Sequence, residues 1–569
     1  MTTNIDIIRN FKFDLIESDN NRLTSIIILT YNKLEYTKLC IESIRKFTKK
    51  GSYEIIVVDN NSTDDTVEWL RQQGDLKVIY NDENKGFPGG CNQGIEIASG
   101  ENILLLNNDA IVTPNWLYNL DKALWSDEKI GAVSCQANTC SYNQSIHVDY
   151  NSMEEMLEFA NRYNVSNEEL WDDRLKLIGF CFMVKKSVID EVGNLDERFF
   201  PGNFEDDDIS FRIIEKGYRL ILCKDTFLHH YGSVSFKNVD GGFDNLLNIN
   251  SQKFEEKWKF NSHSSNYIRF DLIQDLPDNK DEEFNILEIG CGTGATLLEI
   301  KNNYKNANLY GVDINKNVLN IAKNVTQNVI LGDIKDLELP YENGYFDYII
   351  IGDLLQDIPN PEKIIKKIKK YLKNGGYLIF TVINNLNIKY LKQLFKPVTR
   401  NNEYITFDEK NINLLTLDKI RSIITNNEYS LEKLNAFTIE PSESEKRFID
   451  SISKLQINNS KDVYTDYRYL VKAKNIDFER YKTEEMVKFK QILRRIDNGY
   501  DLKENLDYIV DIYKNNKSTF ISDLEHIIEF YVLNKEDVLN KISKEFYVKN
   551  NHEIYNKISK YKEKLELKI

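Results

Sequence analysis

The 569-residue sequence has no apolar run long enough to cross a bilayer, and its first residues lack the apolar core of a signal peptide. Its seven cysteines are scattered and form no Cys-x-x-Cys pair, which argues against a disulfide framework and against structural zinc. No block of lysine and arginine offers a face for a nucleic-acid polymer, and the net charge is −15. We therefore expect a cytoplasmic protein with no transmembrane segment and no nucleic-acid polymer among its partners.

Short β-rich runs alternate with helical patterns between residues 23 and 110. The strand patterns cover residues 23–32, 53–59, 76–81 and 102–109, and the helical patterns cover 36–48, 66–74 and 91–100. Strands that alternate with helices predict a parallel sheet covered on both faces. Ligands of such sheets collect at the carboxyl ends of the strands.

A second α/β pattern begins near Phe284, and its first part, "FNILEIGCGTGATLLEI", predicts a strand, a glycine-rich loop and a helix. After about residue 440, apolar positions recur at three- and four-residue spacing, which predicts helices. At roughly 100–200 residues per domain, the length allows three or four domains. We expect an N-terminal extension (1–22), a first α/β domain (23–262), a linker (263–283), a second α/β domain (284–440) and an α-helical C-terminal module (441–569).

Two carboxylates stand at predicted strand ends. Asp59 can accept hydrogen bonds from a base or ribose lying over the sheet edge, or it can close an ordinary Asx turn. Asp109 follows Asn107 and Asn108, and these oxygens suit a hard cation that bridges a diphosphate, although a turn is again the simpler reading. The glycine-rich stretch 81–94 either lets the backbone approach a ligand closely or is an ordinary loop.

Six segments, in a fixed order, closely resemble the family 2 glycosyltransferases over about residues 23–260. They are "SIIILTYN", "IIVVDNNSTDDT", "NKGFPGGCNQG", "LLLNNDAIVTPNWL", "GFCFMVKKSVIDEVGNLDERFFPGNFEDDDISFRIIEKGYR" and "FLHHYGSVSF". The resemblance implies the GT-A fold, a nucleotide-sugar donor, a divalent cation (Mn²⁺ or Mg²⁺) and inversion at the anomeric carbon.

Carried over by position, the resemblance assigns a nucleotide-sugar site and a metal site. The nucleotide-sugar positions are Thr30, Tyr31, Asn32, Asp59, Asn84, Gly86, Asn107 and Asn108. Asn107 stands where the family often has an aspartate, which leaves Asp109 as the main anionic metal ligand. His229 matches the late histidine that completes the metal shell, with His230 as its rival and structural packing as the alternative for both.

The run Glu205 to Asp208 aligns with the family's Glu-Asp-x-Asp motif. The resemblance assigns Asp206 as general base for the acceptor hydroxyl, with Glu205 and Asp208 shaping the site. Neighbouring carboxylates would raise the pKa of that base. Acidic residues at a helix N-terminus are also stabilised by the helix dipole, so both readings can hold, and Asp208 is the best structural candidate.

The stretch "ILEIGCGTG" resembles the loop of the Rossmann-like S-adenosylmethionine-dependent methyltransferases, over about residues 284–440. By position, the resemblance gives the methionine part of the cofactor to the loop, the ribose to the next strand end, and the adenine to the third. These residues are Glu288, Gly290, Gly292 and Gly294 for the loop, Asp313 for the ribose, and Asp333 and Ile334 for the adenine. Many relatives carry Glu-His where this chain has Gln356-Asp357, so the acceptor side departs from the family pattern.

The leading hypothesis is an inverting, metal-dependent glycosyltransferase that moves N-acetylglucosamine from UDP-GlcNAc to a surface glycan or a protein hydroxyl, such as flagellin Ser or Thr. Its second domain would methylate the glycan with S-adenosylmethionine. The alternative is a dTDP-rhamnose-using transferase whose methyltransferase-like half is a non-catalytic scaffold that docks the acceptor. A third reading makes the whole chain a non-enzymatic interaction platform.

Overall fold

The computed structural model describes residues 3–16, 22–232, 242–394, 415–454, 461–476, 484–532 and 534–566. Residues 233–236 of the sixth glycosyltransferase-like segment and residues 395–414 of the expected second domain therefore lie outside the described residues. Packing divides the chain into two compact units. The first contains residues 1–268, 291–305 and 315–331, and the second contains 269–290, 306–314 and 332–569.

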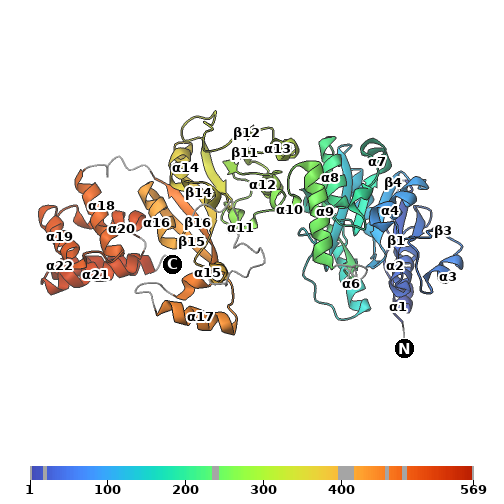
Figure 1. Ribbon diagram of the computed structural model, residues 1–569, viewed down its shortest axis with the longest axis horizontal. Helices are drawn as coiled ribbons and strands as arrows, with labels where there is room; N and C mark the ends of the chain where they lie inside the picture. Colours follow the sequence, from blue (N-terminus) through green and yellow to red (C-terminus); the bar gives the residue numbers. More distant parts are fainter. Residues whose placement is uncertain are drawn as a thin grey trace, which may run out of the picture. The chain divides into compact units, whose positions relative to one another are not determined.

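The first unit, whose strands β1, β3 and β4 are labelled in Figure 1, is built on a nine-stranded sheet. The strand order is β3-β2-β1-β4-β8-β6-β9-β5, with β7 paired to β9. The strands are β1 (Thr24–Thr30), β2 (Tyr53–Asp59), β3 (Leu76–Tyr80), β4 (Asn102–Asn107), β5 (Ala110–Ile111), β6 (Ile130–Ala137), β7 (Trp171–Arg174), β8 (Cys181–Lys185) and β9 (Arg219–His230). The first four are parallel, as expected, whereas β8 pairs antiparallel with both β4 and β6. The sheet is therefore mixed and not wholly parallel.

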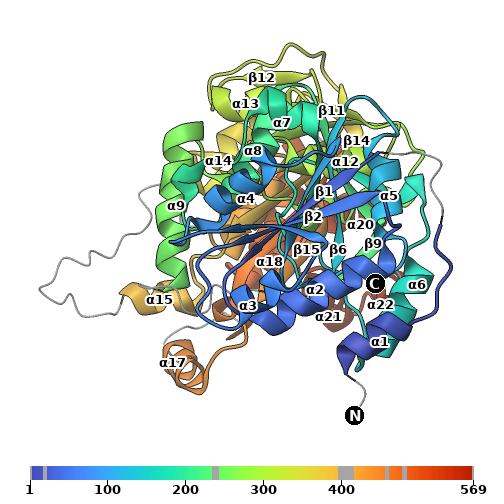
Figure 2. The same cartoon turned by 90° about the vertical axis from the view of Figure 1, so that its right-hand side faces the viewer.

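Helices cover both faces of β1 (Figure 2). Ile26 and Ile28 lie in one apolar core together with residues of α2 (Leu34–Phe47). On the opposite face α4 (Gly86–Glu96) packs closely, because a Cβ at Gly94 would come within 2.5 Å of the Ile27 side chain. The glycines that we expected to form a turn are thus the first half of α4, which begins five residues earlier than predicted.

The remaining helices of the first unit are α1 (Asn4–Asn10), α3 (Thr66–Arg71), α5 (Trp116–Leu124), α6 (Met153–Tyr163), α7 (Lys186–Val192), α8 (Glu205–Glu215), α9 (Phe243–Trp258), α10 (Ser262–Ser265), α12 (Ala295–Asn303) and α13 (Lys316–Ala322). None of the helices in the described ranges combines the length and the apolarity that a bilayer crossing requires.

A second sheet has seven strands in the order β12-β11-β10-β13-β14-β16-β15. They are β10 (Asn285–Ile289), β11 (Asn308–Asp313), β12 (Val329–Leu331), β13 (Phe346–Ile351), β14 (Leu372–Ile383), β15 (Tyr429–Thr438) and β16 (Asp466–Asn475). β16 pairs antiparallel with both β14 and β15. It lies in residues that we expected to be helical, and the alternating pattern of "DYRYLVKAKN" explains why this stretch is a strand.

The C-terminal part of the second unit is helical, as predicted. Five helices, α18 (Glu484–Asp497), α19 (Leu502–Asn515), α20 (Phe520–Tyr531), α21 (Lys535–Val548) and α22 (His552–Glu566), gather in one bundle (Figure 1). Leu493, Ile527 and Ile542 are buried in its core. The other helices of this unit are α11 (Phe270–Ile273), α14 (Pro361–Lys369), α15 (Ile388–Leu394), α16 (Leu417–Asn426) and α17 (Glu443–Ser453).

Gly100 tests how closely the chain packs just before β4. A Cβ at this position would lie 2.6 Å from the Leu23 carbonyl oxygen and 2.7 Å from the Ser25 backbone nitrogen. Because backbone atoms at the start of β1 cannot move aside cheaply, Gly100→Ala should lower the free energy of unfolding by about 1–3 kcal/mol. Chemical denaturation measures this loss. Gly74→Ala is the matched control, since no described atom lies within 4 Å of its Cβ; equal loss in both variants would contradict the expectation.

Candidate active sites

The register of three parallel strands sets the first site. Thr30 of β1 is paired with Asp59 of β2, and Leu29 of β1 is paired with Asn107 of β4. The ends of β2 and β4 therefore flank the end of β1, and Asp59 and Asn107 stand at the same carboxyl edge of the sheet. This is the edge at which ligands of such sheets bind.

Asp59 closes an Asx turn with one carboxylate oxygen and leaves the other without a partner among the described residues. Its side chain is buried, and Oδ2 accepts a hydrogen bond of 3.0 Å from the Ser62 backbone N–H, as in an Asx turn. Oδ1 is also buried and has no hydrogen-bond partner among the described residues. A buried carboxylate oxygen without a donor is costly, so a ligand N–H or O–H at this atom would be stabilising.

Several assigned residues build the edge rather than present free polar groups. The hydroxyls of Thr30 and Thr37 lie 2.9 Å apart, and Asn108 donates to the Thr37 hydroxyl at 3.1 Å, all of them buried. Asn32 accepts from the backbone N–H of Thr63 at 2.7 Å. Tyr31, between Thr30 and Asn32, is exposed.

Asn60 organises the glycine-rich segment, and sequence reasoning missed it. Its Nδ2 donates to Asn84 Oδ1 at 3.0 Å and to the Gly86 carbonyl at 3.1 Å. Its Oδ1 accepts from Asn81 Nδ2 at 2.9 Å and from the Lys85 backbone at 3.2 Å. The available signal was its position directly after Asp59, where a side chain must hold the loop.

His230, and not His229, faces Asp109. Its Nε2 lies 3.3 Å from Asp109 Oδ1 and 3.3 Å from Asn107 Nδ2, and its Nδ1 lies 3.0 Å from the Thr139 carbonyl oxygen. Burial alone would lower the pKa of His230, but the hydrogen bond and charge of Asp109 raise it above the ordinary value.

His229 lies on the other face of β9, since adjacent residues of a strand alternate. Its Nδ1 is 2.6 Å from the Tyr150 hydroxyl, and burial, together with the neighbouring His230, lowers its pKa to about 4. The structure therefore places His230, rather than the predicted His229, beside Asp109.

The donor set fits a divalent cation only in part. No group of three or more His, Cys, Asp or Glu side chains within the described ranges is arranged to hold a metal ion. Asp109 and His230 supply two strong donors, and the Asn107 amide lies beside them. A backbone carbonyl at Nδ1 fixes the imidazole so that Nε2 can ligate. These residues would suit an ion that takes its remaining ligands from a diphosphate.

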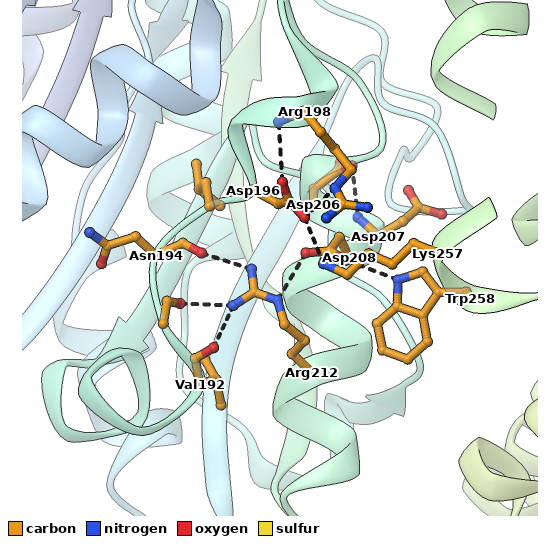
Figure 3. A network of polar contacts seen from close by, with 12 residues as sticks. Val192, Asn194, Asp196, Arg198, Asp206, Asp207, Asp208, Arg212, Lys257 and Trp258 are labelled. Carbon is orange, nitrogen blue, oxygen red and sulfur yellow. Dashed lines mark hydrogen bonds and ion pairs between the residues drawn. The ribbon is translucent and has the colours of Figure 1, made fainter. Parts of the chain in front are cut away.

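The acidic run forms the first turn of α8, and its members are held differently (Figure 3). Asp208 is fully buried, accepts from Arg212 Nε and Trp258 Nε1 at 2.9 Å each, and pairs with Lys257. Asp207 accepts from Lys176 Nζ at 2.9 Å and from the Ser262 hydroxyl. Both carboxylates are thus neutralised by partners within the protein.

Asp206 and Glu205 have no such cation of their own in the part of the chain that the structure describes. Asp206 is partly exposed, and burial and the charge of Asp207 raise its pKa to about 7, against opposing effects of Lys176 and the Gly179 N–H. Burial, and then the charge of Asp206, raise the pKa of Glu205 well above its ordinary value. Near neutral pH, Asp206 is therefore divided between its two protonation states.

Asp206 reaches the strand edge through two consecutive residues. Its Oδ2 accepts from the Gly179 N–H at 3.2 Å, and the next carbonyl, of Phe180, accepts from the Asn107 N–H at 2.9 Å. The Phe180 ring lies 5.1 Å from the His230 ring. The structure therefore connects Asp206 with the Asn107–Asp109 segment.

The second candidate site lies at the carboxyl ends of β10 and β11. Gly290, Gly292 and Gly294 all have positive φ, of 77°, 52° and 83°, a conformation that favours glycine. The Gly290 N–H donates to the Val312 carbonyl at 2.8 Å, which places the loop beside Asp313 at the end of β11. Glu288 of β10 is buried one position before the strand ends.

Within the protein, Asp333 and Ile334, the residues predicted to hold adenine, and Gln356 of the Gln356-Asp357 pair have the following surroundings. Asp333 pairs with Lys335 at 2.9 Å; burial would raise the pKa of Asp333, but the bonds from Lys335 lower it. Ile334 is buried. Gln356 is also buried, and its Oε1 accepts from the Ile383 backbone N–H at 3.2 Å. Gln356 thus fastens the segment after β13 to β14.

Two family models match the chain: "Glycosyl transferase family 2" over residues 25–193 and "Methyltransferase domain" over residues 280–444. The chain carries a family 2 glycosyltransferase domain and a methyltransferase domain. Both resemblances are confirmed, as is the fold class of a GT-A-like domain, a Rossmann-like domain and a helical C-terminal region. Both are enzyme domains.

The relatives match the two-domain chain only in part. An uncharacterized protein, y4gI, of Sinorhizobium fredii is 26% identical over 244 residues, which is 38% of this chain but only 25% of that protein. Malonyl-[acyl-carrier protein] O-methyltransferase of Priestia megaterium is 25% identical over 235 residues, or 38% of this chain and 84% of the relative. A solved mannosyltransferase, PcManGT from Pyrobaculum calidifontis in complex with GDP-Man and Mn²⁺, is 17% identical with a TM-score of 0.32, covering 59% of this chain and 82% of that one.

The raised pKa of Asp206 predicts that the glycosyltransferase domain loses stability against unfolding as the pH rises. The folded pKa, about 7, lies above the ordinary 3.8, so the folded state keeps a proton that the unfolded chain releases. Stability from this group is complete below about pH 4 and is lost as the pH rises through about 7. Asp206→Asn should therefore raise Tm by at least about 2 °C near pH 8 and change it little near pH 4.

Scanning calorimetry at the two pH values measures this difference. Asp190→Asn is the control, since Asp190 is an exposed residue of α7 whose side chain pairs only with Lys186 in the described contacts. A gain that is equal at both pH values, or absent near pH 8, would contradict the assigned burial of the Asp206 charge.

Proposed function

We propose that the chain transfers a sugar from a nucleotide-sugar donor with inversion at the anomeric carbon, and that its methyltransferase domain methylates the glycan product. The donor is UDP-GlcNAc, and the acceptor is a hydroxyl of a surface glycan or of a protein such as flagellin. The supporting observation is a single sheet edge at which Asp59 and Asn107 flank the end of β1, with Asp206 linked to it through Gly179 and Phe180.

Each carboxylate has a distinct part in this reaction. Asp59 Oδ1 accepts a hydrogen bond from the nucleotide base. Asp109 and His230 would hold a divalent cation, which when bound neutralises charge on the leaving diphosphate. Asp206 takes the proton of the acceptor hydroxyl as its oxygen attacks the anomeric carbon and the bond to the diphosphate breaks. A carboxylate with a pKa near 7 is well matched to this task at neutral pH.

A second candidate function keeps S-adenosylmethionine binding without methyl transfer. Its support is that Asp357 stands where many relatives have a histidine, and that the oxygen of the preceding Gln356 is occupied by a backbone N–H of β14. This segment therefore lacks the imidazole that would take a proton from an acceptor. The methyltransferase domain would then dock the acceptor for the glycosyltransferase domain.

Asp206→Asn should abolish sugar transfer while sparing donor binding. Released nucleotide is measured with Mn²⁺ and a panel of UDP-GlcNAc, UDP-glucose, GDP-mannose and dTDP-rhamnose. Loss of a positioned general base typically costs 10²–10⁴-fold, so the best donor should turn over at least about 100-fold more slowly in the variant. Calorimetric titration with that donor should give an unchanged affinity. Wild-type turnover in Asp206→Asn would move the base elsewhere, whereas Asp190→Asn should behave as wild type.

Asp313→Asn should weaken S-adenosylmethionine binding by at least about tenfold, because a charge-assisted hydrogen bond to the ribose is typically worth about 1.5–3 kcal/mol. Isothermal titration measures the affinity, and Asp336→Asn, an exposed neighbour of Asp333, is the control. Absence of binding heat for the wild type at millimolar cofactor would reject the cofactor site. Binding without methyl release in the presence of glycosylated product would favour the docking function.

A further inference from the structure

One buried cation beside the acidic run has no part in the roles assigned above. Lys176 follows β7, and its side chain is largely buried. Its Nζ donates to both carboxylate oxygens of Asp207, at 2.9 and 3.1 Å, and lies 4.9 Å from the centroid of the Tyr142 ring. The Ser262 hydroxyl donates to the same carboxylate. Asp207 is therefore held from two sides.

Among the described contacts, Asp206 is held by backbone donors alone. The Asp207 N–H donates to its Oδ1 at 2.9 Å, and the Gly179 N–H donates to its Oδ2 at 3.2 Å. The orientation of this carboxylate is thus fixed by the turn of α8 and by the segment before β8. Its charge, by contrast, has no direct counter-ion among the described contacts.

We infer that Lys176 and Asp207 are positioning residues that set the proton affinity of Asp206 in opposite directions, and so fix the pH range in which the base is ready. This inference rests on the proposed function of Asp206 as general base. Lys176 and Asp207 touch neither donor nor acceptor in this role. They act through the electrostatic potential that their charges produce at the Asp206 carboxyl group.

The charged and titratable groups around Asp206 determine whether its pKa rises or falls. Glu205 and Asp207 belong to its own helix, Lys176 follows β7, and Cys140 follows β6. Burial raises the pKa of the Cys140 thiol to about 12, so this neighbour is neutral. The charge of Asp207 raises the pKa of Asp206, whereas Lys176 and the Gly179 N–H lower it. Removing the charge of Lys176 must therefore raise the pKa of Asp206, and removing the charge of Asp207 must lower it.

The test compares Lys176→Met with Asp207→Asn in the full chain. Infrared difference spectra against Asp206→Asn isolate the carboxyl band of Asp206 and titrate it without any substrate. The midpoint should rise by about one pH unit in Lys176→Met and fall by about one in Asp207→Asn, the size expected for a charge at this range. Lys176→Arg should restore the wild-type midpoint. Lys216→Met and Asp190→Asn, both exposed, should leave it unchanged.

The acid limb of the rate of UDP-GlcNAc hydrolysis should move in the same two directions. No shift, or a shift of both variants in one direction, overturns the inference. Should Lys176→Met fail to fold, the fall in Asp207→Asn still decides the matter. The two failures are distinguishable: full turnover in Asp206→Asn rejects the proposed base, whereas an inactive Asp206→Asn with unshifted midpoints rejects only the roles of Lys176 and Asp207.

Discussion

The hydrogen-bond register between β1 and its two neighbours is the constraint on which the first site depends. A slip of one residue in either ladder would turn every side chain of that strand to the opposite face. Asp59 and Asn107 would then no longer flank the end of β1. The register is held by packing on both faces: Ile26 and Ile28 lie in the core with α2, while Ile27 lies against Gly94 of α4. The apolar interior of the sheet therefore determines where its polar edge stands.

The first turn of α8 shows how a fold can crowd four carboxylates and still leave one reactive. The helix dipole favours all four, but it is worth at most about 2 kcal/mol, too little to keep four buried charges. Arg212 and Lys257 neutralise Asp208, and Lys176 neutralises Asp207. Burial raises the pKa of Glu205 well above its ordinary value. Asp206 differs from its neighbours, because backbone donors fix its orientation while no cation among the described contacts pairs with its charge.

The sequence predicted those parts of the molecule that local pattern controls. Buried strands, strand-end carboxylates and the C-terminal helices follow from periodicity, and the ion-paired state of Asp208 agrees with its reading as a structural residue. The pair His229 and His230 could not be separated in this way, because neighbours in a strand differ only in which face meets the core. Asn60 was missed because its importance depends on partners about 20 residues away in sequence. β16 was missed although its alternating pattern is visible in the sequence.

In the methyltransferase domain, too, some features follow from the local sequence and others depend on contacts between distant segments. Its cofactor loop depends on three glycines with positive φ, so the backbone itself carries the signal, and motif and structure agree. Other contacts of this domain join side chains from distant segments. Arg468 of β16 lies 2.8 Å from Asp353 after β13, and Arg269 lies 3.5 Å from the same carboxylate. Such a network has no local spacing to read. The glycine-rich loop can therefore be foreseen from one short motif, whereas ion pairs between distant segments become visible only in the folded chain.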